Sequence, residues 1–186
     1  MIYESWPWRR DLMRDADILD RWAAKSMSER RSVLIEKKVF VAAYAMRRLL
    51  QAGKLSTSTD RKPVTVDQFP SIKPIGKQDR WDFHLHYDIA AGSSSTLPAY
   101  RLLDLIIHSF IFAEWQDEVN NRLMIAFTSD RTRDQHLYLV ALTDFVDLIR
   151  FVATDDPEMI VWKRDPNTGE RKEWRGRKAE APADFR

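Results

Sequence analysis

The alternation of apolar and polar residues is most regular in the nine-residue run WDFHLHYDI, which begins at residue 81. The odd-numbered positions are apolar: Trp81, Phe83, Leu85, Tyr87 and Ile89. The even-numbered positions are polar: Asp82, His84, His86 and Asp88. Successive side chains of a strand point to opposite faces, so this run predicts a β-strand. We expect its apolar face in the core and its polar face toward water or a ligand.

Apolar residues three and four positions apart predict two helices at the start of the chain. The first covers residues 5–25, with Ser5 as its cap and Pro7 in its opening turn. The second begins at the sequence Ser-Met-Ser-Glu of residues 26–29, which matches a capping box. It ends at Gly53, where a glycine suits a left-handed C-terminal cap.

Two further helices are predicted in the second half of the chain. Residues 97–109 follow Thr96 as a cap and are apolar almost all round, which is typical of a buried helix. The last helix begins at Thr143 and ends before the Asp-Asp-Pro sequence of residues 155–157.

Short apolar runs between these helices predict an antiparallel sheet. Strands are expected at 123–127 and 136–142, with further strands possible at 110–115 and at 64–66. The strand at 64–66 would be an edge strand within the long connector 54–80. A C-terminal hairpin joins 159–164 to 171–174 through turn residues 165–169, with Trp162 opposite Trp174 and Lys163 opposite Glu173.

These elements predict a single α+β domain over residues 1–178: N-terminal helices packed on a largely antiparallel sheet, a buried central helix, and a C-terminal helix and hairpin. A disordered tail is expected over 179–186. The composition is 44% apolar and 31% charged, with no cysteine, which excludes disulfides, thiolate metal sites and cysteine nucleophiles. No long uncharged apolar run occurs, so we expect a soluble cytoplasmic protein with no membrane contact and no cofactor.

Charge is distributed unevenly along the chain. Residues 1–55 carry 12 basic and 7 acidic side chains, residues 56–160 carry 10 and 16, and residues 161–186 carry 8 and 5. The three segments therefore have net charges of +5, −6 and +3, which sum to the overall +2. Such segments can pair within one chain, pair between two chains, or present a basic surface to nucleic acid. A homodimer is the default assembly that we expect.

Arg101, Asp104 and His108 are the strongly polar residues of the otherwise apolar third helix, and their spacing places them on one face. Arg101 and His108 are separated by six residues, a spacing that resembles the R-x4-6-H pattern of HEPN-type ribonucleases. The resemblance implies metal-independent RNA cleavage, with Arg101 contacting phosphate and His108 as a catalytic group. The alternative is a salt-linked stripe in which Asp104 pairs with Arg101 and His108.

The polar face of the predicted strand at 81–89 offers a second candidate site. His84, His86 and Asp88 have the HxHxD spacing that resembles the start of the metal-binding motif of metallo-β-lactamases. In that motif a histidine follows the aspartate, whereas this chain has Ile89. We therefore keep these residues as candidate ligand-binding residues and do not assign a metal. The alternative is a solvated strand face.

Two segments combine tryptophan with basic residues, a composition that is favoured in contact surfaces. The residues concerned are Trp6, Trp8, Arg9, Arg10, Trp162, Lys163, Arg164, Arg171, Lys172 and Trp174. The N-terminal group is expected to bind a protein partner, and the hairpin group is a candidate for nucleic acid. No catalytic set is complete, so the sequence favours a non-catalytic interaction or assembly module over an enzyme.

Overall fold

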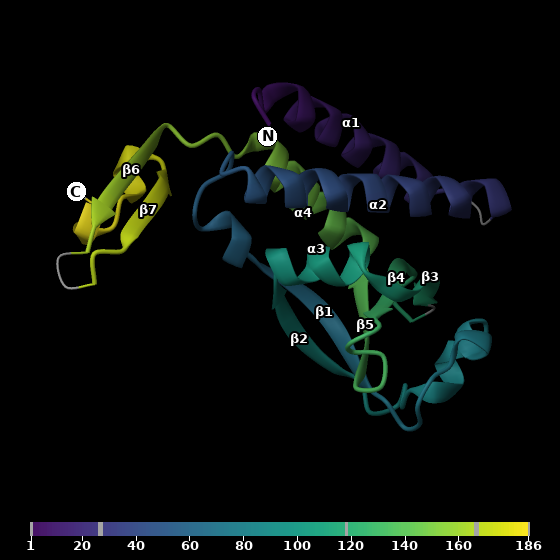
Figure 1. Ribbon diagram of the computed structural model, residues 1–186. Coiled ribbons are helices and arrows are strands. Elements are labelled where there is room, and N and C mark those ends of the chain that lie inside the picture. The colour runs from purple at the N-terminus through teal and green to yellow at the C-terminus, as the bar shows by residue number, and fades with distance from the viewer. Residues whose placement is uncertain (1, 26–27, 118, 166–167, 186) are drawn as a thin grey trace.

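Two long helices begin the chain and form one layer of the molecule (Figure 1). The computed structural model describes residues 2–25, 28–117, 119–165 and 168–185. Helix α1 spans Trp6–Ala23 and helix α2 spans Glu29–Gln51. The Ser28 hydroxyl accepts a hydrogen bond from the Arg31 N–H at 3.2 Å, which caps the start of α2. The cap is thus Ser28 rather than the first residue of the predicted capping box 26–29, of which residues 26 and 27 lie outside the described residues.

The second layer is a five-stranded sheet with the order β2-β1-β5-β4-β3, in which every neighbouring pair is antiparallel. Its strands are β1 (Pro63–Pro70), β2 (Ser93–Pro98), β3 (Ser109–Asp117), β4 (Arg122–Ser129) and β5 (His136–Ala141). Helix α3 (Ala99–Ile107) connects β2 to β3, and helix α4 (Leu142–Thr154) follows β5. The predicted α+β architecture is therefore confirmed.

The two faces of the sheet have different covers. Alternate residues of β4 and β5, such as Ile125 and Val140, belong to a large core that is shared with the four helices. The residues between them, such as Ala126 and Leu139, belong to a smaller core on the opposite face. That core is completed by Phe83 and by two other residues of the segment 71–89, which emerges at the lower right in Figure 1. One face is thus covered by helices and the other by irregular chain.

A two-stranded hairpin lies apart from the sheet at the C-terminal end of the chain (Figure 1). It consists of β6 (Met159–Arg164) and β7 (Arg171–Gly176). The Thr57 N–H donates to the Arg175 carbonyl at 2.9 Å, and the Arg175 N–H donates to the Thr57 hydroxyl at 2.8 Å. Gly53, which ends α2 with a left-handed φ of 66°, lies directly under the Arg175 guanidinium. The hairpin is therefore held against the segment that follows α2.

The predicted strand at 81–89 is wrong. A 3-10 turn at Lys77–Arg80 precedes this segment, and another lies within it at Phe83–His86, where the Leu85 N–H donates to the Asp82 carbonyl. Phe83 and Tyr87 are buried, but Trp81 is 91% exposed and Leu85 is 55% exposed. Residues four positions apart, rather than two, therefore face the core, and the apolar stripe expected of a strand is divided between core and solvent.

Two other strand predictions need correction. The strand predicted at 64–66 is longer, runs from Pro63 to Pro70, and lies inside the sheet between β2 and β5 rather than at its edge. In the hairpin, Trp162 pairs with Glu173 and Val161 with Trp174, a register one residue away from the predicted one. Residues 166 and 167 of the predicted turn lie outside the described residues.

The last residues, for which the sequence predicts a disordered tail, have local structure in the described part. Two 3-10 turns occur at Lys178–Glu180 and Ala183–Phe185, and Ala181 between them is buried. The Phe185 ring lies 6.4 Å from that of Trp174. No helix within the described residues is long and apolar enough to cross a membrane.

Candidate functional site

The exposed faces of α2 and α3 meet in a groove, and both faces are polar. On α2, Tyr44, Arg47, Arg48 and Gln51 follow the spacing i, i+3, i+4, i+7, which places them on one side of the helix. On α3, Arg101, Asp104 and His108 have the spacing i, i+3, i+7. The Arg47 Nε contacts the Asp104 carboxylate at 2.7 Å and so bridges the two helices.

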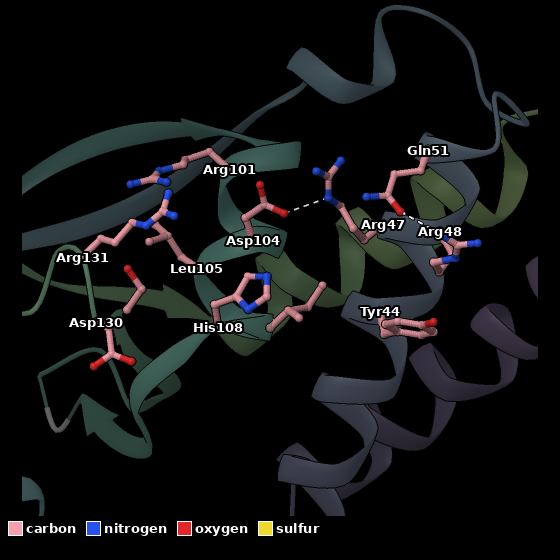
Figure 2. A pocket seen from close by; sticks show the side chains of 12 residues that line it. Tyr44, Arg47, Arg48, Gln51, Arg101, Asp104, Leu105, His108, Asp130 and Arg131 are labelled. Atoms are coloured by element: carbon pink, nitrogen blue, oxygen red, sulfur yellow. Dashed lines mark hydrogen bonds and ion pairs between the residues drawn. The ribbon is translucent and has the colours of Figure 1, made fainter. Parts of the chain in front are cut away.

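These residues line a cavity of about 620 Å³, which the loop after β4 completes (Figure 2). The lining residues are Tyr44, Arg47, Arg48, Gln51, Arg101, Asp104, Leu105, Ile107, His108, Ser129, Asp130 and Arg131. The sequence-predicted triplet Arg101, Asp104 and His108 thus lies in one cavity. Arg101 and Arg131 lie on one side of it, and Arg47 and Arg48 lie on the other.

The cavity is positively charged. Four arginines and two aspartates line it, so these side chains give a net charge of +2 with His108 neutral. Arg47 is paired with Asp104, and Arg48 donates to the Gln51 side chain at 3.0 Å. By contrast, the structure gives Arg101 and Arg131 no ion pair or hydrogen bond within the described residues. Two guanidinium groups from different elements therefore remain available to an anion.

The ion pair of Asp104 differs from the predicted salt-linked stripe, because its partner is Arg47 of α2 rather than Arg101 or His108. His108 follows the last residue of α3, where its backbone N–H donates to the Asp104 carbonyl at 3.0 Å. Its side chain is exposed and turned toward the cavity (Figure 2).

Beneath α3, burial raises the pKa of the Tyr138 phenol, and the positive charge of Arg101 offsets part of that rise.

The second predicted site consists of His84, His86 and Asp88. Two of these residues contact the backbone of their own region. His86 is buried, and its Nδ1 lies 2.9 Å from the Pro74 carbonyl oxygen. Asp88 accepts hydrogen bonds from the N–H groups of residues 90 and 91, as a turn-capping carboxylate does. His84 is exposed. Among the described residues, no three histidine, aspartate or glutamate side chains are grouped as a metal site.

The aromatic and basic residues near the N-terminus are divided between the protein's own interior and its surface. Trp8 packs against the core, and Arg9 bonds to the Asp155 carbonyl at 2.9 Å and to the Asp156 carboxylate at 2.8 Å. Trp6 is 55% exposed, with the Arg10 guanidinium 4.9 Å from its ring. Of this group, Trp6 and Arg10 remain accessible to a partner.

The hairpin concentrates its basic side chains in cross-strand pairs. Lys163 is opposite Lys172, and Arg164 is opposite Arg171. Lys172 is paired with Asp165 at 2.9 Å, and the exposed Trp162 donates to the Glu173 carboxylate at 2.9 Å. Trp174 is buried and therefore unavailable for stacking on a base. The nucleic-acid contact expected of this hairpin stays a prediction.

Sequence reasoning missed the contributions of Tyr44, Arg47, Arg48 and Arg131. The first three are marked in the sequence by the polar face of the second helix, opposite its apolar stripe. Arg131 lies in a loop, and only the three-dimensional structure brings it beside Arg101.

A search of protein-family models, of curated proteins and of solved structures finds no match to this chain.

Proposed function

We propose that this protein is a non-catalytic binding module, and that the cavity between α2 and α3 holds a small anion bearing a phosphate group. The observation that carries the proposal is the convergence of Arg101 and Arg131 on one side of the cavity without a partner among the described residues. They come from a helix and a loop, so the fold itself brings two like charges together. An anion between them removes the repulsion.

Arginine favours phosphate over other anions for geometric reasons. The planar guanidinium presents several N–H donors that match two oxygens of one phosphate, and it stays charged at all relevant pH values. Arg47 and Arg48 on the opposite side can contact further oxygens, although Asp104 already occupies the Arg47 Nε. A cavity of about 620 Å³ lies within the size range of small-molecule sites in proteins.

The test is a calorimetric titration with pyrophosphate at low salt. Arg101→Ala and Arg131→Ala are each expected to weaken binding by about 10- to 100-fold, as the loss of charge-assisted hydrogen bonds implies. Arg14→Ala is the matched control, because Arg14 is a 70% exposed arginine of α1 outside the cavity. Wild-type affinity should also fall as salt is added. Absence of wild-type binding, or equal affinity in all four proteins, contradicts the proposal.

RNA cleavage is the second candidate, favoured by the presence of Arg101 and His108 in one cavity. The HEPN resemblance implies an all-helical bundle, whereas this chain is α+β. The assay compares the wild type with His108→Ala and with His84→Ala as the exposed control histidine, all in the presence of a chelator. Cleavage that only His108→Ala loses supports a nuclease, and equal background in all three proteins excludes it.

The expected homo-oligomer or protein partner rests on the two exposed tryptophans of the basic segments, Trp6 and Trp162. Light scattering on the purified protein across a range of concentrations measures its mass. A dimer mass that Trp6→Ala or Trp162→Ala reduces to that of a monomer identifies the contact surface. A monomer mass at every concentration removes the homodimer and leaves only a different protein as partner.

A further inference from the structure

A second cavity of about 410 Å³ adjoins the arginine cavity at the end of α2 and the start of α3. The two cavities share Arg47 and Gln51. The remaining residues of the second cavity are Leu50, Ser56, Thr57, Asp60, Arg61, Tyr100 and Arg175. Because Arg47 borders both cavities, one ligand can occupy them together with its anionic group in the first.

We propose that the ligand is a nucleotide, with its phosphate in the arginine cavity and its nucleoside in the second cavity. This inference rests on the proposed function, because it adds the chemical class of the ligand to the same site. Two features of the second cavity distinguish a nucleoside from a bare phosphate: an accessible aromatic ring and a buried acceptor without a donor.

The aromatic ring is that of Tyr100, which directly precedes Arg101 on α3. Its side chain is 42% exposed, and it borders the second cavity together with the apolar Leu50. Nucleobases stack on aromatic side chains, and this contact needs a flat accessible face rather than a particular hydrogen-bond pattern. Tyr100 therefore offers a surface for the base one residue away from the arginine assigned to the phosphate.

The buried acceptor is Asp60 Oδ1, which has no hydrogen-bond partner within the described residues. Asp60 lines the second cavity, and a buried carboxylate oxygen without a donor is unfavourable, so a ligand whose donor reaches this oxygen from the cavity is stabilised. The Asp155 carboxylate shows the contrast, because it accepts from the Ser56 N–H and hydroxyl and from the Thr59 hydroxyl. Ribose hydroxyls and base amino groups are donors, whereas the phosphate group of a nucleotide is mainly an acceptor.

The experiment measures the affinities of pyrophosphate, ribose 5-phosphate and the four ribonucleoside monophosphates by calorimetry. The nucleotide that fits best is expected to bind the wild type at least ten times more tightly than ribose 5-phosphate, because only the nucleotide carries a base that can contact Tyr100. Tyr100→Ala should remove this difference and leave pyrophosphate binding unchanged. Tyr3→Ala, which removes an 83% exposed tyrosine outside both cavities, is the matched control.

Asp60→Ala gives the sharper test because two effects act in opposite directions. Removing a negative charge from the lining of the second cavity should tighten the binding of every anion, whereas removing the acceptor should weaken only ligands that donate to it. We expect at least fivefold weaker nucleotide binding with pyrophosphate binding unchanged or tighter. Asp82→Ala is the control for loss of an exposed aspartate outside both cavities. Thermal unfolding checks that each variant is folded. If Asp60→Ala does not fold, Tyr100→Ala provides the second measurement.

The possible outcomes separate this inference from the proposed function. If pyrophosphate binds but no nucleotide binds more tightly than ribose 5-phosphate, the nucleotide is excluded and the anion site stands. If Asp60→Ala changes nucleotide and pyrophosphate binding by the same factor, the nucleotide does not donate to Asp60 and the proposed binding mode is excluded. If no probe binds, both fail. If a 5′-phosphorylated trinucleotide binds more tightly than the monophosphate, the site binds the 5′ end of a nucleic-acid strand. If the monophosphate binds more tightly, the site binds the free nucleotide.

Discussion

Two histidine-bearing segments, residues 81–89 and helix α3 with His108, have similar candidate chemistry in the sequence but different environments in the structure. In the first segment, His86 is buried against the Pro74 carbonyl, and Phe83 and Tyr87 pack on one face of the sheet. In the second, Arg101 and His108 line a cavity opposite the polar face of α2. A row of polar residues forms a site only where another element presents complementary polar residues to it.

The physical difference lies in how each segment satisfies its backbone. The backbone of helix α3 bonds within the helix and, at its start, from the Ala99 N–H to the Lys62 carbonyl, so its polar side chains are free to face the groove. The segment 81–89 has one short 3-10 turn, and the Asp88 side chain accepts hydrogen bonds from the backbone of the turn that follows. His86 and Asp88 therefore serve the local structure, whereas His84 is exposed.

The largest expected effect compares one leucine from each segment. Leu103 of α3 is fully buried, so Leu103→Ala should lower the free energy of unfolding by about 2–5 kcal/mol. Leu85 occupies an apolar position of the predicted strand but is 55% exposed, so Leu85→Ala should change stability by less than about 0.5 kcal/mol. Urea denaturation measures both. Similar losses in the two variants would mean that 81–89 packs its alternating apolar residues together.

The next effect compares the two histidines of the segment 81–89. His86→Ala should cost about 1–2 kcal/mol, because it removes a buried ring and its hydrogen bond to the Pro74 carbonyl. His84→Ala should change stability by no more than about 0.5 kcal/mol, since that ring is exposed. The measurement is again urea denaturation. Equal costs for the two histidines would contradict the structural role assigned to His86.

The smallest expected effect concerns the bridge between α2 and α3. The Arg47 and Asp104 side chains are 28% and 31% exposed, so Asp104→Asn should cost less than about 1 kcal/mol of stability. The same change raises the net charge of the cavity from +2 to +3, and pyrophosphate binding should tighten by about two- to fivefold. Calorimetry and denaturation measure the two quantities. Weaker pyrophosphate binding would show that Asp104 positions Arg47 for the ligand.

The helices were predictable from the spacing of their apolar residues, whereas their caps were predictable only in part: Thr96, expected to cap α3, lies in β2, but α2 carries a signal at each end. Ser28 and Gly53 mark the two ends of α2, and both have the conformations that their positions require. The prediction of a strand at 81–89 was wrong because alternation over nine residues does not distinguish a strand from successive turns that bury every fourth residue. Asp79, whose carboxylate accepts from the Gly76 N–H at 2.9 Å, supports one of these turns.

The hairpin shows how far a turn determines register. Its position and strands were predictable, but a shift of one residue exchanges the faces of every side chain. The observed register buries Trp174 and leaves Trp162 60% exposed.

The cavity was only half predictable, because Arg101, Asp104 and His108 share a helix face whereas Arg131 reaches them through the loop after β4. Contacts between elements distant in sequence are set by tertiary packing.

Gly53 has a consequence beyond the end of α2. A Cβ atom at this position would lie 2.0 Å from the Arg175 Nη1, so any other residue would displace that side chain as well as strain the backbone. Arg175 forms one wall of the second cavity, although it lies far along the chain in the C-terminal hairpin. A displacement of the hairpin would therefore widen the second cavity and leave the lining of the arginine cavity unchanged.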